Sequence, residues 1–174
     1  EANMGKYDDA LEHVNQLIEM DDGLVDAYLV KAQIYNGLKN RPAAMLAISE
    51  AIEKRPENTR LRMQYARMLV QEKRFDQALE HFLVLKKLIP DNENVLLSLG
   101  LLSIELNNDM QAKEYLQELL NKGYHNQQAH YYLGRIQQNQ GEDLAAIANY
   151  DQVYEGEYWL DAKIRSAGLI SAAG

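Results

Sequence analysis

The sequence predicts an all-α solenoid built from antiparallel helix pairs, with about ten helices in 174 residues. The first observation is a unit of 34 residues, 59–92, in which two helical patterns are separated by a break at residues 73–75 and ended by Pro90. The second is an alanine that returns at the same step through the chain, as Ala10, Ala44, Ala78, Ala112 and Ala146. A single helix pair cannot bury its apolar face alone, so successive pairs must stack.

Three more ladders keep the 34-residue step. One is made of small residues: Ala32, Ala66, Gly100, Gly134 and Gly168. The second is bulky: Val14, Ile48, Phe82, Leu116 and Tyr150. The third is Leu17, Ala51, Leu85, Leu119 and Val153. Small residues let helix axes approach closely, so these ladders predict the packed side of every helix pair.

The period, the small residue before a bulky one, the alanine and the closing Pro56 and Pro90 resemble the tetratricopeptide repeat over essentially the whole chain. The resemblance implies a right-handed superhelical solenoid with a concave face that binds other proteins. The aromatic residue that the family places near the start of the first helix is present as Tyr28. Other residues stand there in the other copies: Arg62, Leu96, His130 and Ile164. Helix projection places Arg62 on the packed side, and we expect it to send its charged head outward.

We expect a single array over residues 1–174, predicted to be a piece of a longer protein. Its parts are a half repeat at 1–24, full repeats at 25–58, 59–92, 93–126 and 127–160, and a half repeat at 161–174. Asn58, Asn92 and Asn126 stand one step apart just before first helices, which predicts that they are N-caps.

The composition of the chain limits the classes of partner that it can be expected to bind. The chain is 47% hydrophobic, has no cysteine and carries a net charge of −8 from 26 acidic and 18 basic residues. A duplex or an anionic membrane surface would repel such a chain, so nucleic acid is excluded as a first partner. No apolar run approaches the roughly 20 residues of a membrane span, and we expect no direct membrane insertion.

The unpacked side of the first helices is the candidate binding groove. One row across the four repeats reads Leu29, Met63, Leu97 and Tyr131. The next reads Gln33, Arg67, Leu101 and Arg135, and the third Asn36, Val70, Ile104 and Gln138, with Tyr132 nearby. Leu97, Leu101 and Ile104 are unusually apolar for a solvated face. We predict a groove that binds a peptide with apolar anchors near Leu97 and Leu101 and a carboxylate on Arg67 or Arg135. Alternatively, the leucines are covered by the chain itself.

Candidate chemistry is sparse. His125 and His130 would lie about 140° apart on a helix, unlike metal ligands three or four residues apart. No phosphate-binding glycine loop or nucleophile elbow occurs, so we predict no catalytic site, metal or cofactor. The resembled family's clamp for chaperone tails uses Lys and Asn at places where this chain has Leu29, Met63, Tyr131 and Gln33, so we do not expect it to bind such a tail.

Two functions stay open: a non-catalytic protein interaction scaffold, and a targeting or adaptor module of a larger enzyme or of a protease or secretion complex. A weaker resemblance, carried by residues 150–153, Gly156, Ala162, Arg165, Ala167 and Leu169, is to long tetratricopeptide lipoprotein adaptors of the Gram-negative outer membrane. It implies the bacterial periplasm, while a cytoplasmic location stays open. We also expect end-to-end self-association through the helices around Leu11 and Ile164.

Overall fold

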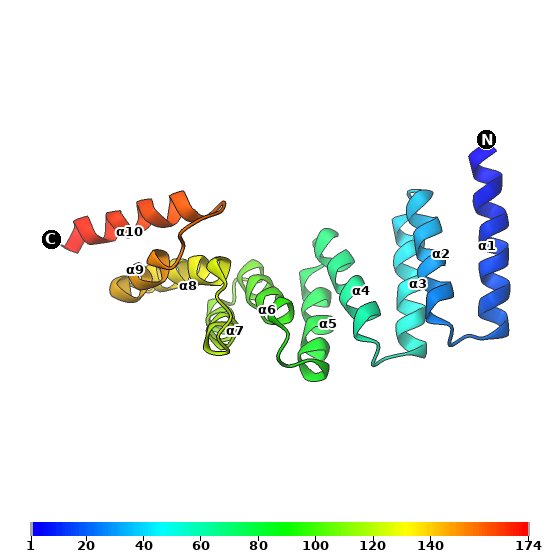
Figure 1. Cartoon of the computed structure of the whole chain (residues 1–174), viewed down its shortest axis with the longest axis horizontal. Helices are drawn as coiled ribbons and strands as arrows, with labels where there is room; N and C mark the ends of the chain where they lie inside the picture. Colours follow the sequence, from blue (N-terminus) through cyan, green and yellow to red (C-terminus); the bar gives the residue numbers. More distant parts are fainter. Residues whose placement is uncertain (1, 174) are drawn as a thin grey trace. The chain divides into compact units, whose positions relative to one another are not determined.

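The computed structural model describes residues 2–173, and within them it shows ten α-helices and no strand (Figure 1). The prediction of an all-α helical repeat solenoid is confirmed. The helices are α1 (Ala2–Met20), α2 (Val25–Gly37), α3 (Arg41–Lys54), α4 (Thr59–Gln71), α5 (Phe75–Leu88), α6 (Glu93–Glu105), α7 (Asp109–Asn121), α8 (Gln127–Asn139), α9 (Asp143–Asp151) and α10 (Trp159–Ala173).

The same turn joins the two helices of each pair. Its central residue has a left-handed backbone, with φ of 57° at Lys39, Lys73 and Asn107 and 74° at Gly141. The next amide then donates back to a carbonyl in the last turn of the first helix, as from Asn108 N to Ser103 O at 2.8 Å. This arrangement pairs carbonyls that a helix end leaves open, so each helix stops at the same step of the repeat.

Asparagine side chains begin the helices. The predicted caps are confirmed: the Oδ1 atoms of Asn58, Asn92 and Asn126 accept from backbone amides three residues ahead at 3.0, 3.1 and 2.9 Å. Asn40 and Asn108 cap the second helices α3 and α7 in the same way, which the sequence analysis missed. Each cap pairs an amide that has no partner inside the helix.

Small and bulky residues meet inside each pair, as the ladders predict. Ala44, Ala78, Ala112 and Ala146 are all fully buried. A Cβ added at Gly100 would lie 2.6 Å from the Leu116 side chain, and one at Gly134 would lie 2.8 Å from the Tyr150 ring. Glycine therefore occurs where the helix axes come closest.

The helices form two compact units, and the boundary falls between Leu88 and Ile89. In the first unit α2 packs on α1 and α3, and α4 packs on α3 and α5. In the second, α6 packs on α7, α7 on α8, α8 on α9 and α9 on α10. Each unit has its own buried residues. No helix within residues 2–173 combines the length and apolar character that crossing a bilayer requires.

The expectation for Arg62 is wrong. Its side chain is buried, with Nη2 donating to Pro56 O at 2.6 Å and Nη1 3.2 Å from Nδ1 of His81 on α5. The head turns inward because the loop carbonyl and the imidazole supply acceptors there. Burial lowers the pKa of Arg62. Burial and then the nearby guanidinium lower the pKa of His81.

Candidate partner-binding surface

The predicted groove residues of the first unit lie on α2 and α4. Gln33, Asn36 and Arg67 are exposed, and Met63 and Val70 are half-buried. Leu29 was expected to face the groove, and this is wrong, because only 7% of it is exposed. α2 lies between α1 and α3, which both pack on it, so Leu29 belongs to the core of this unit.

A hollow of about 440 Å³ follows α4 in the first unit, lined by Arg60, Met63, Gln64, Arg67, Met68 and Gln71. Met63 and Met68 supply flexible, polarisable thioethers. Arg60 and Arg67 are exposed, and neither has a carboxylate partner in the part of the chain that the structure describes. The hollow therefore combines apolar contact area with two free cations.

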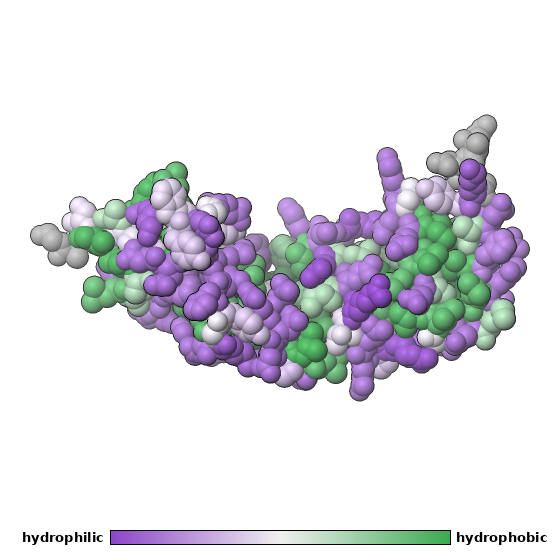
Figure 2. Space-filling view, in the orientation of Figure 1, coloured by the Kyte–Doolittle hydropathy of each residue, from purple (hydrophilic) through white to green (hydrophobic). Residues whose placement is uncertain are grey.

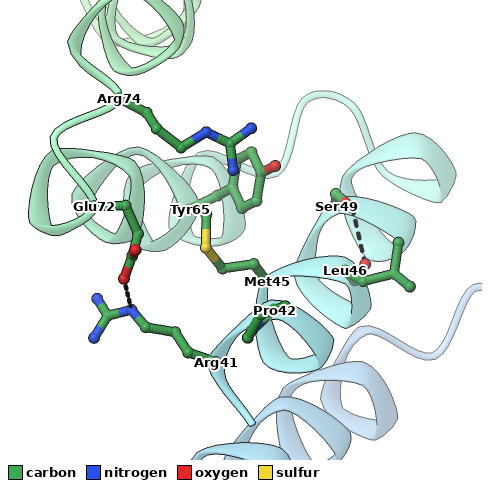
Figure 3. Close-up of a pocket in the computed structure, with 8 residues that line it drawn as sticks. All are labelled: Arg41, Pro42, Met45, Leu46, Ser49, Tyr65, Glu72 and Arg74. Carbon is green, nitrogen blue, oxygen red and sulfur yellow. Dashed lines mark hydrogen bonds and ion pairs between the residues drawn. The ribbon is translucent and has the colours of Figure 1, made fainter.

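A second hollow, of about 290 Å³, lies between α3 and α4 (Figure 3). Its lining residues are Arg41, Pro42, Met45, Leu46, Ser49, Tyr65, Glu72 and Arg74. The repeat pattern of the sequence does not predict this hollow. Arg41 Nε pairs with Glu72 Oε1 at 2.6 Å, and Ser49 Oγ donates to Leu46 O at 2.9 Å. Arg41 and Glu72 therefore neutralise each other's charge in this hollow, although Arg41 Nε makes no hydrogen bond within the described residues.

In the second unit, the predicted apolar residues of α6 are half-buried. Leu97 and Ile104, together with Tyr132 of α8, pack against the buried cluster formed by Leu96, Ala112, Leu116, Leu119, Ala129, Leu133 and Ile136. Leu101 is half-buried without being part of that packing. The structure thus brings Leu97, Ile104 and Tyr132 together at the edge of one core.

Three tyrosine rings meet beside this edge. Tyr131 stacks on Tyr158 with ring centroids 4.6 Å apart, and Tyr132 meets both rings edge-on at 5.2 and 5.6 Å. Tyr131 was expected to face the groove, and this is wrong: it is 7% exposed. Tyr158 covers it from the segment before α10, a contact that helix periodicity does not reveal. Burial, followed by hydrogen bonding with Tyr132 and Glu157, raises the pKa of Tyr158 far above its usual range.

Arg135 is the exposed cation of this surface. Its Cζ lies 5.9 Å from the centroids of both the Tyr131 and the Tyr132 rings, within the range of a cation–π interaction. Within the described residues no carboxylate forms an ion pair with it, although its charge is one of the smaller causes that lower the pKa of Asp161. The two rings therefore position a guanidinium whose hydrogen-bond donors remain available for a ligand.

A polar network lies next to the rings. Asp161 Oδ2 accepts from Tyr131 Oη at 2.7 Å and from Arg165 Nε at 2.6 Å, and Gln138 Oε1 accepts from Tyr150 Oη at 2.7 Å. The bonds from Arg165 and then Tyr131 lower the pKa of Asp161. Burial and the bond to Asp161 raise the pKa of Tyr131.

Tyr158, Asp161 and Arg165 were not among the residues predicted for the surface. Arg165 stands one step beyond Tyr131 in the first groove row, so continuing that row by 34 residues would have found it. Within residues 2–173 no three His, Asp or Glu side chains are placed to hold a metal ion together.

Stacked helix pairs joined by identical turns, with one helix face left free, define a helical-repeat interaction scaffold. The chain belongs to the tetratricopeptide repeat family, since the model of that family matches residues 38–93 and 97–162.

A curated relative is the type IV pilus assembly protein PilF of Pseudomonas aeruginosa, 25% identical over 118 residues, which are 67% of this chain and 47% of the relative. The chain therefore spans about half the length of the curated relative it matches. The solved structure of P. aeruginosa PilF superposes with a TM-score of 0.68 at 20% identity, covering 97% of this chain and 83% of that one.

Two other solved structures share the fold. YrrB, described as a tetratricopeptide protein with an unusual peptide-binding site, has a TM-score of 0.73 at 17% identity over 94% of this chain and 84% of its own. MamA has a TM-score of 0.70 at 12% identity over 96% and 94%. These likenesses support the fold.

Proposed function

We propose that this chain is a non-catalytic scaffold that binds an extended segment of a partner protein on the free face of α6 and α8. Leu101 and Tyr132 would contact apolar side chains of that segment, and Arg135 would bind a carboxylate. The surface of α4, with Met63, Val70 and Arg67, would offer a second contact of the same chemistry.

The observation that carries the proposal is Arg135, a guanidinium that is set against two aromatic rings and forms no ion pair within the described residues. A charge-assisted bond from arginine to a carboxylate is about twice as strong as a neutral one. The half-buried Leu101 nearby in the groove rows still has apolar area to cover. An acidic group next to an apolar anchor is therefore the peptide chemistry that this surface fits.

Panning a display library of random peptides against the purified chain tests this proposal, followed by fluorescence anisotropy with the enriched peptides. Arg135→Ala should weaken binding at least roughly tenfold, which corresponds to the loss of one charge-assisted bond. The matched control is Arg74→Ala, an exposed arginine whose Nε donates to Gln77 instead. Equal loss in both variants, or acidic peptides that bind unchanged to Arg135→Ala, would refute the assignment.

Leu101→Ser separates binding from folding. Leu101 is half-buried outside the packed edge of the core, so its replacement should lower affinity while the helical circular dichroism stays unchanged. Leu144→Ser, on the highly exposed α9 position, is the control. If Leu101→Ser unfolds the second unit, Leu101 is a core residue and not a binding residue.

A second candidate function is an adaptor module of a larger assembly or secretion complex, including an adaptor of the outer membrane. The similarity to a pilus assembly protein over 118 residues favours it. Disrupting the gene in its bacterial host and counting surface pili tests the pilus case. Complementation by the wild-type gene but not by Arg135→Ala is the expected result, and unchanged piliation in the disrupted strain would exclude it.

A further inference from the structure

Two of the first helices combine basic residues with a complete lack of acidic ones. α4 has Arg60, Arg62 and Arg67, α8 has Arg135, and neither helix contains Asp or Glu. Within residues 2–173 each of the other helices contains at least one acidic residue. The chain as a whole has a net charge of −8 and therefore repels an acidic ligand. α4 and α8 are the helices where that repulsion is locally reversed.

On α4 two guanidiniums share one face. Arg60 and Arg67 are seven residues apart, which places them on the same side of the helix and about 10 Å apart along its axis. Both are exposed, form no ion pair within the described residues and line the hollow of about 440 Å³ together with Met63. Figure 2 shows hydrophilic side chains over α4 beside a hydrophobic area over α2 and α3 of the same unit. Binding on α4 therefore depends on charge, with Met63 as the apolar contact.

Arg135 on α8 is the matching group in the second unit. It stands 68 residues after Arg67, which is two repeat steps, and the residue between them at this step is Leu101. α6, which carries Leu101, has no Lys or Arg and has Glu93 and Glu105. The first helices are therefore basic at two separate places, one in each unit, and not along one continuous row.

We propose that this chain is a bivalent scaffold that binds two acidic motifs of one partner protein at the same time, one on α4 and one on α8. The inference rests on the proposed function, and it adds that α4 is a complete second site and that the partner carries the motif twice. Each motif has a carboxylate next to an apolar side chain, and a neutral linker joins the two motifs. Charge complementarity selects this partner, because Arg60, Arg67 and Arg135 form no ion pair within the described residues.

Two exposed sites gain most when their ligands are joined. An ion pair at an exposed arginine contributes little by itself, so one motif alone should bind weakly. Once the first motif is bound, the second site meets its motif at an effective concentration that the linker sets. Joining two motifs can raise the affinity by roughly 10² to 10⁴ without any new contact. Bivalency is therefore how a surface of this kind obtains affinity.

Isothermal titration calorimetry tests the proposal with two synthetic peptides. One carries a single Glu-Leu-Glu motif, and the other carries two such motifs joined by Gly-Ser linkers of about 10 to 40 residues. The single-motif peptide should find two sites on the wild-type chain and one site on either Arg135→Ala or the double variant Arg60→Ala, Arg67→Ala. The tandem peptide should bind the wild type at least roughly tenfold more tightly than the single motif, and should lose this gain in both variants.

Lys87→Ala is the matched control, since it removes an exposed cation of α5 that belongs to neither site. A single-motif peptide that finds one site, lost in Arg135→Ala and kept in the α4 double variant, would overturn this inference and leave the proposed function intact. One site that is lost only in the α4 double variant would instead refute the assignment to Arg135. A tandem peptide that gains no affinity at any linker length would overturn bivalent binding. Single-stranded DNA of equal charge that binds as tightly as the tandem peptide would overturn the assignment to an acidic protein segment.

Discussion

The same repeat position is filled by a buried ion in one unit and by neutral groups in the other. In α4 and α5, Arg62 faces His81 and donates to Pro56 O. The residue 68 positions after Arg62 is His130. Its Nδ1 lies 2.8 Å from Oδ1 of Asn149, and Nδ2 of Asn149 donates to Gln137 Oε1 at 2.7 Å. Both places lie between the first and second helix of a repeat, so the two side-chain solutions can be compared directly.

The two pairs satisfy their buried polar groups to different extents. The neutral pair of α8 and α9 extends into a chain of amides that satisfies both members. Arg62 makes two bonds, but its buried Nε has no partner within the described residues. A buried cation that depends on one imidazole and one carbonyl is more sensitive to the loss of its surroundings than a neutral network.

The largest expected effect is that of Arg62→Ala. It leaves Pro56 O and His81 without their donor and opens a cavity, so the free energy of unfolding of the first unit should fall by roughly 2–4 kcal/mol. His130→Ala, at the equivalent place, should cost about 1 kcal/mol because only a neutral bond is lost. Denaturant melts of both variants measure the difference. Equal losses would show that burial of the charge is irrelevant.

The second prediction tests close packing in the first unit. Ala78 is fully buried in α5, so Ala78→Leu should lower stability by about 1–3 kcal/mol through overpacking. Ala10, its counterpart in α1, is half-buried, and Ala10→Leu should cost much less. Thermal unfolding followed by circular dichroism compares the two. An unchanged melting temperature for Ala78→Leu would contradict the packing scheme.

The third prediction compares two glycines at one repeat position in the second unit. Gly134→Ala gains helix propensity, but its Cβ would lie 2.8 Å from the buried Tyr150 ring, so we expect a net loss of about 1 kcal/mol. Gly168→Ala meets open space and should gain up to about 1 kcal/mol. The midpoints of chemical denaturation of the two variants should therefore move in opposite directions from that of the wild type. Shifts of the same sign would show that the contact with Tyr150 does not affect stability.

The sequence predicts contacts that repeat and misses contacts that occur once. The 34-residue ladders predict the glycine seats, the alanine core and the caps at Asn58, Asn92 and Asn126, because a solenoid places equivalent residues in equivalent surroundings. The inward turn of Arg62 depends on His81 and on the Pro56 carbonyl, and no other copy has an arginine at this position. The burial of Tyr131 depends on Tyr158 from a connecting segment. Periodicity assigns a residue to a helix face, but it does not show what a loop places over that face.

The smallest predicted effect is a pH dependence of the free energy of unfolding that differs between the two units. Burial and Arg62 lower the pKa of His81, while Glu80 raises it and the Tyr65 ring contacts it edge-on at 4.9 Å. His81 in the unfolded chain has the ordinary pKa of about 6.5, so below that pH the unfolded state binds more protons than the folded one. The stability of α4 and α5 should therefore fall as pH drops from 7 toward about 5.

The second unit should respond to pH differently. The pKa of Asp161 is lowered, so the stability that its ionised form contributes is lost only as pH falls below the ordinary carboxyl range of about 4. Amide hydrogen exchange, corrected for intrinsic rates, measures the opening of α4 and α5 across this range. His81→Asn copies the neutral partner of α9 and should remove the dependence above pH 5. If the slope survives in His81→Asn, another group titrates there and the buried pair is not its origin.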